Sequence, residues 1–226
     1  MKRGLCILSE SGRDEMFYER IAERVLNESF TAIDLPVMVK TQRNAPWKEV
    51  LNLAQKTIKR LQHWEGQQHM ALIIAVDNDR APGHPGAKPH ARTLPPQDQR
   101  KAPRYPALQT LLQAQFGPDR ATWPMDIALA VPVEMIESWV LVLLNPSRAE
   151  LPIFGEADQA SAITYFNGHP PKQLKDLCQQ EAEAAAESRD QLFDRAAEQD
   201  LSTAEAASLS LKMFTDELRA WRKASD

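Results

Sequence analysis

The chain has 226 residues, of which 43% are hydrophobic and 26% are charged, and its formal net charge at pH 7 is −4. This composition is typical of a globular protein of one domain, with or without a helical extension. Apolar runs fall far short of the ~20 residues that a transmembrane helix needs, and two cysteines exclude a disulfide framework. We therefore expect a cytoplasmic protein with reduced thiols and no membrane partner.

Strand and helix patterns alternate through the first two thirds of the chain. Short apolar runs rich in Ile and Val predict buried strands, and amphipathic segments predict helices between them. This alternation favours a mostly parallel, four-stranded α/β sheet with right-handed crossovers. The expected elements are a strand at 4–9, a helix from Ser11 to about Asn27, a strand within 30–39, a helix from Pro46 to about Trp64, a strand at 70–76, a helix at 106–116, a strand at 127–131 and a helix that Pro132 opens.

Strand signals stop after about residue 155, and the remainder is rich in Ala, Glu and Gln. These residue types favour helices, which we expect near 156–166, 171–187 and 203–222. The sequence thus predicts an α/β domain at residues 1–150 and a helical extension at 151–226 packed on it.

Acidic residues follow the predicted strands at matching places. Glu10 follows the first strand, Asp77 and Asp79 follow the third, and Glu134 and Glu137 follow the fourth. Strand ends of a parallel sheet meet at one edge, and residues i and i+2 of an extended chain share a face. Such carboxylates suit Mg²⁺ or Mn²⁺. The alternative is that single acids here are turn formers or helix caps, but the Asp77–Asp79 pair favours the site.

The segment 80–106 is rich in proline and in positive charge. A loop of this length is usually functional or disordered, and basic side chains beside a metal site suit a nucleic-acid backbone. The alternative is a solvated insertion without a partner. The basic residues of the segment are Arg80, Lys88, Arg92, Arg100, Lys101 and Arg104, against the single acid Asp98.

Several sequence blocks resemble those of a known family. Leu8-Ser-Glu-Ser-Gly12 and Ile73-Ile-Ala-Val-Asp-Asn-Asp79 are similar to the two signature blocks of the TOPRIM fold. The segment Ala128-Leu-Ala-Val-Pro-Val-Glu-Met-Ile-Glu-Ser-Trp-Val-Leu resembles a helix of small bacterial TOPRIM-like proteins of the OLD/Abi type, as do Pro170-Pro-Lys-Gln-Leu174 and the closing helix with Phe214. Members of this group are often linked to phage defence, and some are encoded beside ATPases.

The resemblance implies roles for individual residues. Glu10 matches the TOPRIM glutamate, a general acid/base or metal ligand, and Asp77 and Asp79 match the metal-binding Asp-x-Asp. Glu137, two residues before Trp139, matches the acid of the narrower group, and Glu134 is a weaker candidate. The chain departs from the pattern where Ser11 follows Glu10 in place of the usual glycine, and it shows no tyrosine placed as in topoisomerases.

These observations predict a Mg²⁺- or Mn²⁺-dependent TOPRIM-like nuclease that acts on DNA or RNA in phage defence or DNA repair. His84, His90 or Lys88 are candidates to move a proton. The main alternative is a non-catalytic partner or regulatory subunit of an ATPase or nucleic-acid complex, with the helical tail as its docking surface. A third interpretation is an RNA-directed enzyme or toxin.

Overall fold

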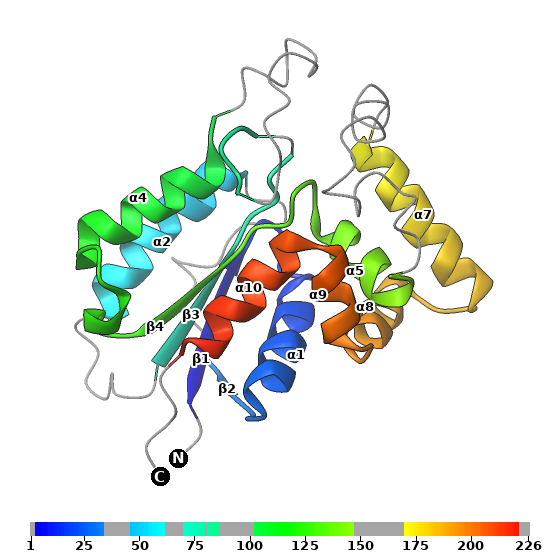
Figure 1. Ribbon diagram of the computed structural model, residues 1–226, viewed down its shortest axis with the longest axis horizontal. Coiled ribbons are helices and arrows are strands. Elements are labelled where there is room, and N and C mark those ends of the chain that lie inside the picture. Colours follow the sequence, from blue (N-terminus) through cyan, green and yellow to red (C-terminus); the bar gives the residue numbers. More distant parts are fainter. Residues whose placement is uncertain are drawn as a thin grey trace. The chain divides into compact units, whose positions relative to one another are not determined.

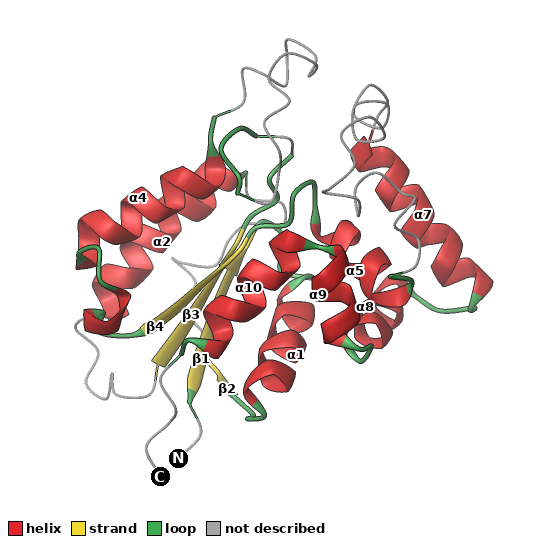
Figure 2. Cartoon of the chain, in the orientation of Figure 1, coloured by secondary structure: helices red, strands yellow, loops and turns green. Residues whose placement is uncertain are grey.

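The computed structural model describes residues 3–33, 46–61, 70–79, 81–85, 102–146 and 170–221. They form an α/β fold in which strands and helices alternate before a series of helices (Figures 1 and 2). The elements are β1 (Gly4–Ser9), α1 (Glu15–Leu26), β2 (Thr31–Ala32), α2 (Trp47–Leu61), β3 (Met70–Ala75), α4 (Arg104–Phe116), the 3-10 turn η3 (Arg120–Thr122), β4 (Asp126–Ala130), α5 (Ile136–Leu144), α7 (Pro170–Ala184), α8 (Arg189–Ala197), α9 (Leu201–Ala207) and α10 (Leu209–Arg219).

The described strands form a parallel sheet in the order β2-β1-β3-β4. Ile73 at the middle of β3 lies opposite Ile7 of β1 and Ala128 of β4. All six residues of β3 are buried, as expected for a central strand covered on both faces. The α/β class and the parallel sheet are thereby confirmed, although β2 contributes only two residues.

Helices cover both faces of the sheet. Figure 1 shows α2 beside α4 on one face and α1 beside α10 on the other. Tyr18 of α1 packs edge-to-face on Phe214 of α10, with ring centroids 6.0 Å apart. Right-handed crossovers place α1 and α2 on opposite faces, because the chain moves in opposite directions along the sheet after β1 and after β2.

The chain divides into two compact units. Unit 1 consists of Met1–Val76, Pro106–Ala130 and Phe214–Asp226, and unit 2 consists of Asp77–Tyr105 and Val131–Met213. Unit 1 contains the sheet, and unit 2 contains the residues that follow β3 and β4 together with α5, α7, α8 and α9. The boundary predicted between residues 150 and 151 lies outside the described residues and stays a prediction.

Unit 2 has its own apolar core around α5, which packs against α7, α8 and α9. Trp139 is fully buried there, as expected for a core residue, and its indole Nε1 donates a hydrogen bond to Ser210 Oγ at 2.9 Å. Cys178 of α7 is buried as a free thiol in this unit, as Cys6 is in unit 1. This burial confirms both cysteines as core residues.

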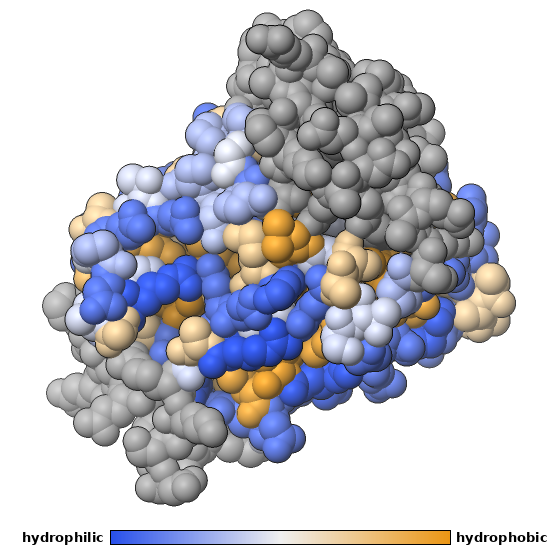
Figure 3. Space-filling model, in the orientation of Figure 1, coloured by the Kyte–Doolittle hydropathy of each residue, from blue (hydrophilic) through white to orange (hydrophobic). Residues whose placement is uncertain are grey.

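Two details of the predicted α1 were wrong. The helix was predicted to start at Ser11, but it begins at Glu15, and Asp14 is the residue that precedes it. Ser11 lies in the turn before the helix, where its backbone carbonyl accepts a hydrogen bond from Asp14 N at 3.0 Å. The apolar spacing of the sequence puts Met16 on the same face as Phe17 and Ile21. Met16 is nevertheless 52% exposed, because the buried residues of the helix are Phe17, Tyr18, Ile21 and Ala22. On the face that Figure 3 displays, apolar areas are separated by polar residues.

The helix after β4 begins later than predicted. Pro132 does not open it, since α5 begins at Ile136 and Glu134 lies in the connection before it. The carbonyls of Pro132 and Glu134 accept hydrogen bonds from Asn78 N and Asp79 N, and this pairing holds residues 132–134 outside the helix. Glu137 does lie in the first turn, as expected.

The predicted tail helices are confirmed only in part. α7 corresponds to the helix expected at 171–187, the helix expected at 203–222 is divided into α9 and α10 at Ser208, and α8 was missed. The helix expected near 156–166 falls outside the described residues. No helix within the described ranges is long and apolar enough to cross a membrane.

Candidate functional site

The residues that follow β3 and β4 pair with each other in unit 2 (Figure 2). Asn78 N donates to Pro132 O at 3.0 Å, and Asp79 N donates to Glu134 O at 2.9 Å. These bonds extend the parallel pairing of the strands past their ends. The Asp-x-Asp motif is therefore held beside the connection that carries Glu134.

Asp77 binds the N-terminus of α5. Its Oδ1 accepts a hydrogen bond from Ile136 N, the first residue of the helix, at 3.1 Å. Met135, which precedes the helix, supplies no side-chain cap. The Asp77 carboxylate therefore satisfies a helix donor from outside the helix and places a negative charge at the positive end of the helix dipole.

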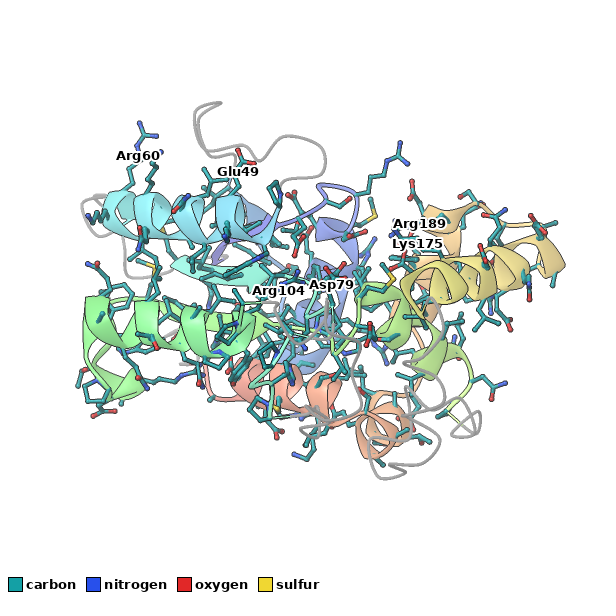
Figure 4. All side chains as sticks on the ribbon, turned by 90° about the horizontal axis from the view of Figure 1, so that it is seen from above. Glu49, Arg60, Asp79, Arg104, Lys175 and Arg189 are labelled. Carbon is teal, nitrogen blue, oxygen red and sulfur yellow. The ribbon has the colours of Figure 1, made fainter. Side chains whose placement is uncertain are left out.

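Asp79 forms an ion pair with Arg104 of α4 (Figure 4). Arg104 Nη2 lies 2.9 Å from Asp79 Oδ2, and Nη1 of the same guanidinium donates to the backbone carbonyl of Asp77. The side chain of Arg104 is 9% exposed and that of Asp79 is 32% exposed. Asp79 has a φ of 42°, a left-handed conformation that Asp tolerates better than most residues.

The two glutamates after β4 are both buried, with exposed fractions of 0% for Glu134 and 4% for Glu137. Glu137 Oε1 lies 3.5 Å from Arg189 Nη2, and its backbone carbonyl accepts a weak hydrogen bond from Cys178 Sγ. A buried carboxylate is costly unless a cation or hydrogen bonds compensate it. Arg189 provides this compensation for Glu137.

His84 lies in the same loop but is sequestered. Its Nε2 is 2.8 Å from Val131 O, and its ring packs on Tyr105 with centroids 5.1 Å apart. Burial lowers the pKa of His84 to about 4, although the hydrogen bond to Val131 opposes this shift. The ring is neutral at pH 7 and 3% exposed, so it serves packing better than proton transfer with a substrate.

The remaining predicted residues are placed only in part. Glu10 is half-buried and belongs to unit 1, whereas the other four acids belong to unit 2, so its approach to them stays a prediction. Arg104 is buried in the ion pair described above. The other predicted nucleic-acid contacts lie outside the described residues: Arg80, Lys88, Arg92, Arg100 and Lys101.

Sequence reasoning missed the partners of the acids. Arg104 lies 25 positions from Asp79, and Arg189 lies 52 positions from Glu137. Contacts between residues so far apart in the sequence cannot be predicted from a local pattern. Asn78, between the two aspartates, was also missed. It is fully buried, its Nδ2 donates to Ala81 O at 2.9 Å, and its Oδ1 has no hydrogen-bond partner among the described residues.

The donor chemistry of the acids suits a hard cation, but the described residues contain no group of three His, Cys, Asp or Glu side chains that could hold a metal ion. Mg²⁺ is often held by one or two carboxylates, with water and substrate phosphates as its other ligands. Asp77 and Asp79 supply two carboxylates, and each already has one oxygen engaged, Asp77 by Ile136 N and Asp79 by Arg104. A comparison of the chain with protein-family models, curated proteins and solved structures finds no match.

Proposed function

We propose that this protein is a Mg²⁺- or Mn²⁺-dependent phosphodiester hydrolase that acts on nucleic acid, and that its α/β fold is TOPRIM-like. The observation that carries the proposal is the pairing of the Asp-x-Asp loop with the connection before α5, which gathers Asp77, Asp79 and Glu134 in one unit. Acids at the carboxyl ends of parallel strands lie where ligands of α/β folds bind. A cytoplasmic role in phage defence or DNA repair is part of the proposal.

The acids have separate roles in this proposal. Asp77 and Asp79 hold the cation, and Glu137, Glu134 and Glu10 are further ligands or carry the proton of the attacking water. A bound Mg²⁺ would neutralise charge on the scissile phosphate and lower the pKa of a bound water. The basic residues of 80–101 contact the phosphate backbone, which carries most of the affinity in nucleic-acid binding.

The replacement of Asp77 by Asn tests the proposal. Asn keeps an oxygen that can accept the hydrogen bond from Ile136 N, so the cap of α5 is retained while the negative charge is lost. We expect Asp77→Asn to lower metal-dependent cleavage by ~100-fold or more, with an unchanged circular dichroism spectrum. The measurement is nicking of supercoiled DNA and cleavage of structured RNA with Mg²⁺, Mn²⁺ or EDTA.

Asp176→Asn provides the matched control, because Asp176 is an exposed aspartate on α7 of the same unit. This variant removes the same charge without touching the loop, and we expect it to cleave like the wild type. An Asp77→Asn protein with full metal-dependent activity would contradict the assignment of Asp77.

A second candidate is a non-catalytic partner of an ATPase or nucleic-acid complex. The observation that favours it is that Asp79 and Glu137 are each within 4 Å of an arginine, which neutralises part of the negative charge without a metal. Stable association with an ATPase or nucleic acid, together with no divalent-metal binding, would favour this function over hydrolysis.

A further inference from the structure

Arg104 contacts the Asp-x-Asp motif at two points. Its Nη2 binds the carboxylate of Asp79, and its Nη1 binds the backbone carbonyl of Asp77. The guanidinium fork thus spans both ends of the motif, and Figure 4 shows the Arg104 and Asp79 side chains side by side. A cation of this chain already lies against one of the two carboxylates that the proposed function assigns to the metal.

The placement of Arg104 is unfavourable for its own helix. Arg104 is the first residue of α4, and a positive charge at a helix N-terminus is opposed by the helix dipole. Its guanidinium is also almost fully buried. The Asp79 carboxylate offsets both costs, so the ion pair accounts for the position of an arginine that would otherwise destabilise this end of the helix.

Arg104 and a divalent cation would require the same carboxylate. Two cations that share one carboxylate repel each other, so binding of one weakens binding of the other. The Asp79 side chain is 32% exposed, so an ion can approach it from solvent, whereas the Arg104 side chain is only 9% exposed. Metal binding then has to break or weaken the contact between Arg104 Nη2 and Asp79 Oδ2.

We propose that Arg104 is an internal counter-cation of the Asp-x-Asp motif that competes with the divalent metal for Asp79 and so sets the metal concentration at which the site fills. The inference rests on the proposed function, since it concerns loading of the same site. The second contact, to the carbonyl of Asp77, keeps Arg104 beside the loop after Asp79 is released. In the metal-free protein, Arg104 thereby neutralises the charge of Asp79, one of the two aspartates of the motif.

The opposite role for Arg104 predicts the opposite result. If Arg104 served only to position the loop for metal binding, its removal would weaken the affinity for metal. Competition instead predicts that removal strengthens it. The sign of the change therefore separates the two roles.

The test is calorimetric titration of Mn²⁺ into the wild type, Arg104→Gln and Arg104→Lys. We expect Arg104→Gln to bind Mn²⁺ roughly three- to tenfold more tightly than the wild type, the range that loss of a partly exposed ion pair allows. Arg104→Lys keeps the charge but not the two-point fork, so its affinity should lie between the two. Arg195→Gln is the matched control, because Arg195 pairs with Glu187 at 3.0 Å elsewhere in unit 2.

Unchanged or weaker Mn²⁺ binding by a folded Arg104→Gln protein would overturn the inference about Arg104. The proposed function would still stand in that case if the wild type binds Mn²⁺ and the Asp77→Asn variant does not. Absence of binding in the wild type and in every variant would overturn both. Binding that appears only in Arg104→Gln would support the inference.

A second measurement uses the wild type alone, in case the variants do not fold. The guanidinium NMR resonance of Arg104 should shift as Mg²⁺ is added if the ion displaces it from Asp79. A resonance that stays unchanged at saturating Mg²⁺ would overturn the inference.

Discussion

At the residue scale, Asp77 is compatible with both interpretations that the sequence leaves open for these acids, a helix cap and a metal ligand. It caps α5 through Ile136 N, as a structural acid would, and it is also the first acid of the Asp-x-Asp motif that the proposed function assigns to the metal. The sequence was sufficient to predict that the connections after the third and fourth strands lie near each other, because parallel strand ends converge, and their backbone hydrogen bonds confirm this. It was not sufficient to predict Arg104 and Arg189 as their partners, since those contacts depend on tertiary packing.

His84 provides a prediction at the residue scale. Its pKa is lowered from 6.5 to about 4 by burial, so the unfolded chain binds the proton more readily than the folded protein between these pH values. The stability due to neutral His84 is fully present above pH 6.5 and is lost as pH falls toward 4. By urea denaturation we expect the unfolding free energy of the wild type to fall by up to roughly 3 kcal/mol more than that of His84→Gln over this range. An unfolding free energy that depends on pH equally in the wild type and in His84→Gln would contradict this prediction.

At the scale of elements, the start of a helix carries a local capping signal in some cases and none in others. α8 was missed although Ser188 and Gln191 form a capping box, in which Gln191 N donates to Ser188 Oγ and Ser188 N donates to Gln191 Oε1. These two residues are present in the sequence, but they form a shorter signal than the Ala- and Glu-rich run before them, which itself favours a helix. The late start of α5 had no local signal, because the loop pairing that sets it involves residues more than 50 positions away.

The outer edge of β4 provides a prediction at the element scale. Leu129 N donates to Glu217 Oε2 of α10 at 2.6 Å, and Glu217 Oε1 pairs with Arg120 Nη2 at 2.9 Å. Glu217→Ala leaves a buried N–H without this acceptor, and we expect a loss of ~1–3 kcal/mol in the free energy of unfolding. Glu217→Gln keeps an acceptor and should cost less than about 1 kcal/mol. Urea denaturation measures both, and equal losses would show that the Leu129 contact contributes nothing.

At the scale of the whole molecule, the sequence predicted the order of strands and helices through α5 and the parallel sheet. Buried strands such as β3 carry an apolar pattern that local composition reveals. The division into two units was not predicted, because each unit is assembled from separated segments and the chain passes between them within α4 and α10. Such boundaries depend on long-range packing and leave no composition signal.

Calorimetric titration of Mn²⁺ into the wild type, Asp77→Asn and Asp79→Asn is the most direct test of whether the acids after β3 form a metal site. Asn suits both positions, since it can accept the bond from Ile136 N and tolerates the positive φ at residue 79. We expect binding in the wild type and at least about tenfold weaker binding in each variant, the result of removing one charged ligand. Absence of binding in the wild type, or equal binding in all three proteins, would mean that these acids serve the structure alone.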